Sequence, residues 1–185
     1  AKQFSRLRNN NAIASGFPGL DKIFNKNYKP LNLWKKYSNG IAKKIIWAPH
    51  HTILGDGTGL DYSSFMEYYN FMFYLLEHFS GRIQISFKPH PLLREKLYKH
   101  SDWGFDRTEK YYEQWREHPY GQLDVGEYSN LFKTSDALIH DCASFLAEYL
   151  ATGKVIVSNY VSAYKDLDLF PMISEFADSE SIIDL

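Results

Sequence analysis

The sequence lacks several features that would assign it to other classes of protein. It has a single cysteine, Cys142, so no internal disulfide is possible, which fits a reducing compartment. No apolar run approaches the ~20 residues of a membrane span, and the given sequence does not open with the pattern expected of a signal peptide. The 21 basic and 22 acidic residues give a net charge of −1, which argues against a broad nucleic-acid surface. Because the sequence begins at Ala1 rather than at a methionine, we read it as an excised domain or a processed fragment.

Aromatic side chains, in contrast, are abundant. Tyrosine occurs 14 times and phenylalanine 13 times among 185 residues, and 44% of the residues are hydrophobic. Large rings dominate core and interface packing, so we expect most of them to be buried. The length suits one domain with a real core, preceded by a separate N-terminal segment.

Residues 1–40 differ from the rest. They begin basic and rich in asparagine, and Gly16, Pro18 and Gly19 are turn formers. We predict a connector with a short strand at 12–15 and a helix at 20–24. The many lysines up to residue 44 fit a solvated connector best, and contact with an anionic membrane surface is the alternative.

From residue 41 to residue 185 the pattern predicts an α/β domain. Apolar strands alternate with helices, as in right-handed βαβ units, which implies a Rossmann-like parallel sheet with helices on both faces. Ser63 or Ser64 is expected to cap the first helix, Pro91 to begin the second, and Gly153 to end the last. The predicted strands are 43–49, 82–89, 122–125, 137–140 and 154–159, and the predicted helices are 64–79, 92–100, 106–118, 127–134, 143–151 and one starting near 179.

Polar residues follow three of these strands. Ligands of open α/β sheets bind beyond the carboxyl ends of the strands, so these residues are expected to line one crevice. They are His50 and His51 after the first strand, Lys88 and His90 after the second, and His140, Asp141 and Ser144 after the fourth.

Two of these segments carry recognisable chemistry. In Lys88-Pro-His90-Pro the prolines hold the backbone extended around an imidazole, which with a cation can bind a diphosphate or protonate a leaving oxygen. The same prolines also suffice to end a strand and begin a helix. At Asp141–Ser144 a strand turns into a helix, whose free N–H groups and positive dipole end favour a phosphate. Glu148, one helical turn further on, is placed to accept hydrogen bonds from ribose hydroxyls.

Other chemistries are less well supported. Adjacent His50 and His51, without a cysteine cluster or a His-x-x-x-His pattern, do not favour zinc, and we expect no metal and no cofactor. Cys142 reads as a small buried thiol rather than a nucleophile. The glycine-rich stretch 55–59 is not followed by Gly-Lys-Ser/Thr, so it is not a Walker A loop, and a lid is an alternative role.

Taken together, these motifs resemble the C-terminal, donor-binding half of the CDP-glycerol glycerophosphotransferase family, the teichoic-acid polymerases and primases. That half has a GT-B-type, Rossmann-like fold. The segments that match, in family order and spacing, are GFPGLD (16–21), IIWAPHH (45–51), FKPHP (87–91), SDALIHDCAS (135–144) and GKVIV (153–157).

The resemblance implies roles for individual residues. His90 corresponds to the donor-side histidine that contacts the diphosphate and assists departure of CMP. Ser144, with the backbone amides of Cys142 and Ala143, corresponds to the pyrophosphate-binding turn that Asp141 shapes, and Glu148 to the ribose-binding carboxylate. Lys88, His50 and His51 are further donor-binding candidates.

The chain also departs from the family pattern. The family's Thr-Trp-Arg is His50-His51-Thr52 here, its Tyr-Ser-Ser is Cys142-Ala143-Ser144, and no proline follows Lys154. The donor therefore stays open among CDP-glycerol, CDP-ribitol and a nucleotide sugar. A nucleotide-sugar glycosyltransferase, a sugar-nucleotide epimerase and a non-catalytic nucleotide-binding domain remain alternatives.

The resemblance further implies a bacterial enzyme of cell-wall polysaccharide synthesis, in the cytoplasm or at the inner face of the membrane. The donor would be a CDP-linked polyol and the acceptor a polyol phosphate or a glycan. The base that activates the acceptor belongs to the family's N-terminal domain, from which residues 1–40 would connect. We therefore expect this chain to bind nucleotide without turnover on its own.

Overall fold

The computed structural model describes residues 17–36, 42–57, 59 and 61–158. The strand predicted at 12–15 and the helix predicted near 179 lie outside these residues, as does residue 159 at the end of the last predicted strand.

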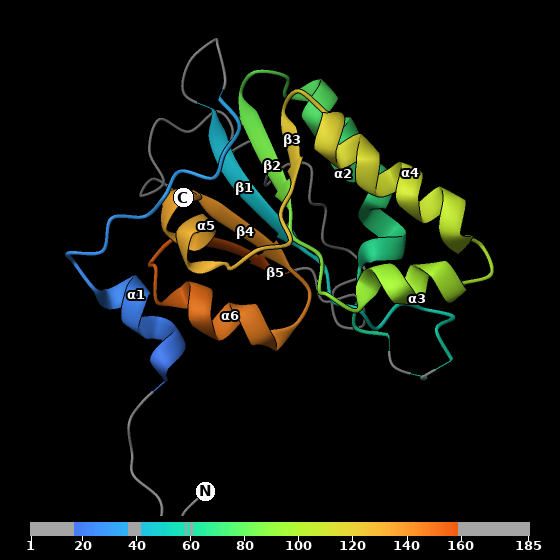
Figure 1. Cartoon of the computed structure of the whole chain (residues 1–185), viewed down its shortest axis with the longest axis horizontal. Helices are drawn as coiled ribbons and strands as arrows, with labels where there is room; N and C mark the ends of the chain where they lie inside the picture. Colours follow the sequence, from blue (N-terminus) through green and yellow to red (C-terminus); the bar gives the residue numbers. More distant parts are fainter. Residues whose placement is uncertain (1–16, 37–41, 58, 60, 159–185) are drawn as a thin grey trace, which may run out of the picture.

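Five parallel strands form one sheet in the order β3-β2-β1-β4-β5 (Figure 1). Each pair of neighbours runs in the same direction. The strands alternate with helices along the chain, so the predicted α/β class with a Rossmann-like parallel sheet is confirmed. The strands are β1 (Lys43–Ala48), β2 (Ile83–Phe87), β3 (Gly121–Leu123), β4 (Ala137–His140) and β5 (Val155–Ser158).

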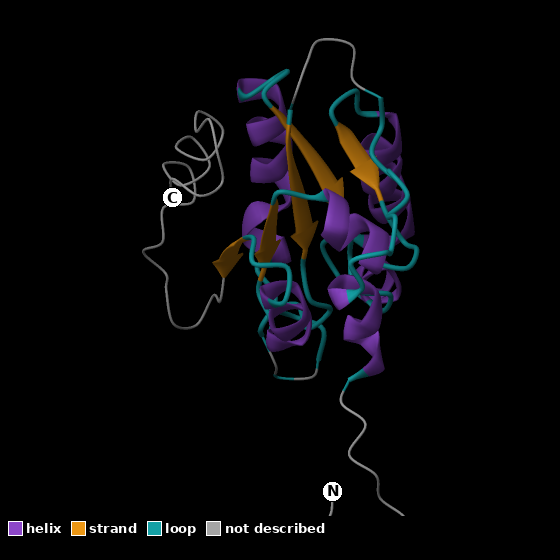
Figure 2. Ribbon diagram, turned by 90° about the vertical axis from the view of Figure 1, so that its left-hand side faces the viewer, coloured by secondary structure: helices purple, strands orange, loops and turns teal. Residues whose placement is uncertain are grey.

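Helices cover both faces of this sheet, as Figure 2 shows from the side. One face packs against α2 (Phe65–His78) and α4 (Gly104–Glu117), with α3 (Leu93–Lys99) beside α4. The other packs against the 3-10 turn η2 (Pro18–Leu20), α1 (Asp21–Phe24), α5 (Ser129–Thr134) and α6 (Ala143–Leu150).

Strand β1 shows why the sheet needs both layers. Ile45 and Trp47 enter the core beneath α2 and α4, whereas Ile46 and Ala48 enter the core beneath α5 and α6. Successive side chains of a strand point to opposite faces, so a central strand buried on both sides must be apolar without interruption.

The predicted start of α2 is confirmed, whereas two other predicted helix boundaries were wrong in detail. Ser64 stands at the N-cap of α2 and its hydroxyl donates to Asp141, while Ser63 Oγ accepts the backbone N–H of Phe65, the first residue of the helix, at 3.2 Å. Helix α3 begins at Leu93, because a turn from His90 to Leu93 occupies the positions where Pro91 was expected to start it. Helix α6 ends at its C-cap Ala151, and Gly153 follows in the left-handed conformation, with φ of +69°.

Residues 17–36 pack on the domain. Trp34 is buried in the core under α5, and its indole N–H donates to Thr134 Oγ1 at 3.0 Å. The Lys35 backbone N–H donates to Gln122 Oε1 at 3.0 Å. This part of the predicted connector is therefore held against α5 and the β3 edge of the sheet.

Among the described residues, no helix is both long enough and apolar enough to cross a membrane.

Candidate functional site

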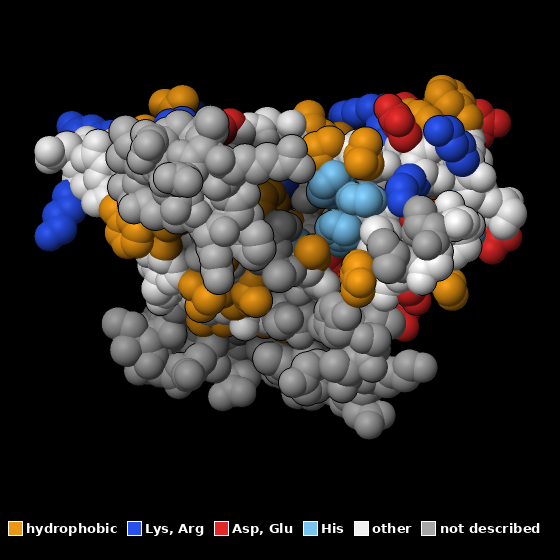
Figure 3. All heavy atoms as spheres, turned by 90° about the horizontal axis from the view of Figure 1, so that it is seen from below, with side chains coloured by type: hydrophobic (Ala, Val, Ile, Leu, Met, Phe, Trp, Pro, Cys, Tyr) orange, Lys and Arg blue, Asp and Glu red, His pale blue; other side chains and the backbone are white. Residues whose placement is uncertain are grey.

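The site lies at the carboxyl edge of the sheet, where the strand order changes direction. Strands β2 and β3 lie on one side of β1, and β4 and β5 on the other, so the helices after β1 and β4 leave on opposite faces and open a crevice between them. Figure 3 views the molecule from below, the end towards which β1 runs in Figure 1, and shows histidine side chains gathered there.

A pocket of about 580 Å³ opens in this crevice. It combines apolar walls with a few polar groups, which is typical of small-molecule sites. Its walls come from the ends of β1, β2 and β4, from the segment after β3, and from single side chains of α3, α4 and α6. The lining residues are Ala48, Pro49, His50, Lys88, Pro89, His90, Pro91, Arg94, Tyr112, Val125, Gly126, Tyr128, His140 and Phe145.

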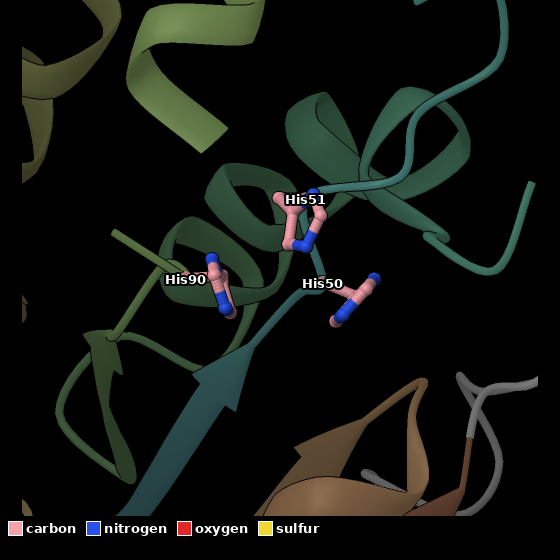
Figure 4. A group of neighbouring side chains, drawn as sticks. All are labelled: His50, His51 and His90. Atoms are coloured by element: carbon pink, nitrogen blue, oxygen red, sulfur yellow. The ribbon is translucent and has the colours of Figure 1, made fainter. Parts of the chain in front are cut away.

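Three histidines cluster together, as predicted from their positions after the strands, and two of them, His50 and His90, line this pocket. Figure 4 shows His50 and His51 at the end of β1 beside His90, which follows β2. The ring centroids of His51 and His90 are 4.2 Å apart, and those of His50 and His90 are 5.3 Å apart.

These imidazoles are neutral at pH 7. Burial lowers the pKa of His50 to about 4, assisted by repulsion from His51 and His90. Burial is also the main cause that lowers the pKa values of His51 and His90, and Lys96 contributes to both. The cluster can therefore donate and accept hydrogen bonds but brings little positive charge.

The hydrogen bonds of His90 assign its tautomer. The Leu92 backbone N–H donates to His90 Nδ1 at 3.1 Å, so the neutral ring carries its proton on Nε2. His90 can thus present an N–H donor to an anion in the pocket.

The same cluster is the one group of described residues with metal-ligand character, since one nitrogen of each ring lies within 4.8 Å of the others. The proton on His90 Nε2 and the bond from Leu92 to Nδ1 leave no free lone pair on that ring. Metal binding would require His90 to give up this arrangement.

Asp141 joins the loops around the pocket. Its buried carboxylate accepts the His50 backbone N–H at 2.8 Å, and the Ser64 backbone N–H and hydroxyl at 2.8 and 3.1 Å. Burial raises the pKa of Asp141 to about 6 although these hydrogen bonds act in the opposite direction. Asp141 thus holds the loop after β1 and the start of α2 against the end of β4, while it does not itself line the pocket.

Lys88 lines the pocket, but its ammonium group is already bound. Nζ lies 2.8 Å from Asp124 Oδ1 and 2.6 Å from the Gly126 carbonyl oxygen, and the Lys88 and Asp124 side chains are 6% and 9% exposed. This pair fixes the segment after β3, which forms one pocket wall.

The turn from β4 into α6, for which phosphate binding is predicted, is present as a backbone feature. Cys142 is the N-cap of α6 in extended conformation, and its side chain makes no capping hydrogen bond. The side chains of Ala143 and Ser144 lie outside the described part of the structure. The half-buried Cys142 does not line the pocket.

Glu148 is also not one of the residues that line the pocket. Its Oε2 is buried without a hydrogen-bond partner among the described residues. Burial and a hydrogen bond to Glu148 raise the pKa of Tyr128 to about 12, so Tyr128, which does line the pocket, links this carboxylate to it.

Several pocket residues were missed by the sequence analysis. Arg94 extends from α3, and Glu109 of α4 accepts hydrogen bonds from its Nε, at 2.8 Å, and from its Nη2. Tyr128 and Phe145 lie side by side, with ring centroids 5.1 Å apart. Arg94, Tyr128 and Phe145 gave no recognisable sequence signal, because they come from helices and loops whose orientation depends on packing. His140, in contrast, was expected from its position at a strand end, and it lines the pocket.

Comparison with known proteins gives a family and two distant structural similarities. The family profile described as CDP-Glycerol:Poly(glycerophosphate) glycerophosphotransferase matches residues 2–166. No curated protein sequence matches significantly. UDP-GlcNAc 2-epimerase from Methanocaldococcus jannaschii is 14% identical, with a TM-score of 0.44 over 72% of this chain and 33% of that one. The beta Kdo 2,4 transferase KpsC from Thermosulfurimonas dismutans is 18% identical, with a TM-score of 0.41 over 71% and 37%. The chain thus spans about a third of the length of each.

Proposed function

Since the chain belongs to the CDP-glycerol:poly(glycerophosphate) glycerophosphotransferase family, we propose that its pocket binds a CDP-linked polyol donor for transfer of glycerol phosphate or a similar polyol phosphate. The acceptor would be a polyol phosphate or a glycan of a cell-surface polymer. The observation that carries the proposal is the His90 N–H donor at a pocket of about 580 Å³ at the carboxyl edge of the sheet.

The proposed donor fits the distribution of polar and aromatic groups. The histidine cluster would face the diphosphate, and the amides at the start of α6 would provide further donors at a positive helix end. Tyr128 and Phe145, which also line the pocket, would offer ring faces for the nucleoside, with Glu148 and Tyr128 near its ribose. Lys88 and Arg94 are each paired with a carboxylate, so they would orient the donor more than they would add net positive charge to the pocket.

The reaction would be a direct displacement at the β-phosphorus. An acceptor hydroxyl forms the new O–P bond, the bond from phosphorus to the bridging oxygen breaks, and CMP leaves with the electron pair. His90 Nε2–H and the backbone amides of the α6 turn would stabilise the charge that develops on CMP. We propose that the acceptor's proton goes to a base in a further domain, so the chain alone would bind donor without turnover.

Calorimetric titration of the purified chain with CMP, CDP, CDP-glycerol and UDP tests this function. We expect cytidine-selective binding that His90→Ala weakens about tenfold to a hundredfold, the effect of losing one hydrogen bond to a charged group. Ser144→Ala would test whether that side chain contributes to the turn. His78→Ala, at the far end of α2, serves as the control that should bind normally.

The outcomes separate the candidate functions. UDP selectivity would refute a CDP donor and favour a nucleotide-sugar enzyme. Normal binding by His90→Ala would exclude the assigned role of this histidine. A folded wild-type chain that binds none of the four nucleotides would refute donor binding by this chain.

A further inference from the structure

His140 has a ring nitrogen that the described protein leaves unused. It is the last residue of β4, its side chain is buried, with a residue exposure of 5%, and it lines the pocket. Its Nδ1 is hydrogen-bonded to the Ala48 carbonyl oxygen. Its Nε2 is buried and has no hydrogen-bond partner among the described residues.

The contact with Ala48 decides which nitrogen carries the proton. A carbonyl oxygen can only accept, so Nδ1 must be the donor. Burial lowers the pKa of His140 to about 4, and the ring is neutral at pH 7. Nε2 therefore holds a lone pair and can act only as an acceptor, the opposite of His90 Nε2.

The position of this acceptor is rigid. Ala48 and His140 are register partners in the central strand pair β1 and β4, so the backbone ladder fixes both ends of the His140–Ala48 hydrogen bond. Side chains on paired strands are held in position more precisely than side chains on loops.

His140 also lies between the two parts of the pocket. Its ring centroid is 5.6 Å from that of Phe145, on the wall proposed for the nucleoside. It is near enough to His50 and His90 for a proton on any one ring to disfavour protonation of another. A group that reaches Nε2 would thus belong to the part of a ligand next to its phosphates.

A buried acceptor without a hydrogen-bond partner is destabilising, and such groups are retained where a ligand supplies the missing hydrogen bond. Phosphate oxygens cannot complete this one, because they too are acceptors. The partner must be a hydrogen donor, and the groups of a polyol nucleotide that lie next to its phosphates and carry one are hydroxyls.

We propose that His140 Nε2 accepts a hydrogen bond from a ligand hydroxyl next to the phosphates, which makes His140 a specificity-determining residue. The proposal rests on the proposed function for the kind of ligand. The hydroxyl comes from the ribose or from the transferred polyol, and both sources share the same chemistry.

Nitrogen NMR of the chain with ¹⁵N-labelled histidine tests the proposal directly. His140→Phe identifies the His140 resonances in the wild-type spectrum by removing them. In the free protein we expect His140 with a protonated Nδ1 and an unprotonated Nε2. When ligand binds, the Nε2 resonance should move in the direction expected for a nitrogen whose lone pair accepts a hydrogen bond. The ligands are CMP, 2′-deoxy-CMP, 3′-deoxy-CMP, CDP-glycerol and UDP.

Affinity provides a second readout. His140→Phe should bind the ligand that moves the His140 Nε2 resonance about tenfold more weakly than the wild-type protein does, the effect of one lost hydrogen bond. His78→Phe, the same substitution on α2 away from the pocket lining, should bind normally.

Each pattern of NMR shifts decides between the sources or overturns the idea. Movement by CMP that a deoxy-CMP fails to reproduce assigns a ribose hydroxyl, and movement by CDP-glycerol alone assigns a polyol hydroxyl. Ligands that move the His90 resonances but leave His140 Nε2 unchanged would overturn this proposal while the proposed function stands. Movement by UDP alone would keep the His140 role and overturn the CDP donor. If no ligand moves any histidine, both proposals are wrong.

Discussion

Replacing Lys88 by methionine tests whether this residue positions the pocket wall or binds the ligand. At 2.8 Å, the attraction between Lys88 Nζ and Asp124 Oδ1 is about 6 kcal/mol at an effective dielectric constant of ~20, before desolvation is counted. Methionine keeps most of the apolar stem but leaves Asp124 charged and 9% exposed, and leaves the Gly126 carbonyl without this donor. Breaking a buried pair in this way costs about 3–5 kcal/mol, which we expect as the loss in free energy of unfolding in urea titrations.

A double variant separates the two roles. Lys88→Met with Asp124→Asn removes both charges and should recover about 2 kcal/mol of that loss, because no unpaired charge stays buried. If the double variant binds CDP with normal affinity, Lys88 acts by positioning the pocket wall. If the double variant binds CDP weakly although its stability has recovered, Lys88 contacts the ligand. Arg116→Met, at a pair whose side chains are 41% and 51% exposed, is the control and should cost under about 1 kcal/mol. A loss below about 1 kcal/mol for Lys88→Met would refute the reasoning.

Two further predictions concern pH. Burial raises the pKa of Asp141 from 3.8 to about 6, so its contribution to stability is present below pH 3.8 and is lost as the pH rises through 6. Unfolding at a series of pH values should show wild type losing up to about 3 kcal/mol relative to Asp141→Asn between pH 4 and 7, and parallel curves would contradict this. His140 has the opposite sign: its pKa is lowered from 6.5 to about 4, so wild type should lose stability, by up to about 3 kcal/mol relative to His140→Phe, as the pH falls from 6.5 to 4.

The strands could be predicted from the sequence because apolar runs between turn formers are a local feature. The five strands predicted for residues 41–185 are all present, and the meeting of the polar residues at their ends follows from parallel alignment alone. That is why His50, His51 and His90 were correctly expected to lie together. The helix starts were less accurate, since a turn such as that from His90 to Leu93 depends on a few hydrogen bonds rather than on periodicity.

The sequence by itself therefore determined the α/β class, the order of elements along the chain and the candidate strand-end residues. Only the tertiary structure decided how those residues are used. Asp141 accepts from His50 and Ser64 across 91 and 77 positions, and Lys88 pairs with Asp124 across 36. Such contacts depend on strand order and on how helices pack, which no local pattern of residues encodes. The lone pair of His140 has the same origin, because the proton on its other nitrogen is fixed by a carbonyl on a neighbouring strand, 92 positions earlier in the chain.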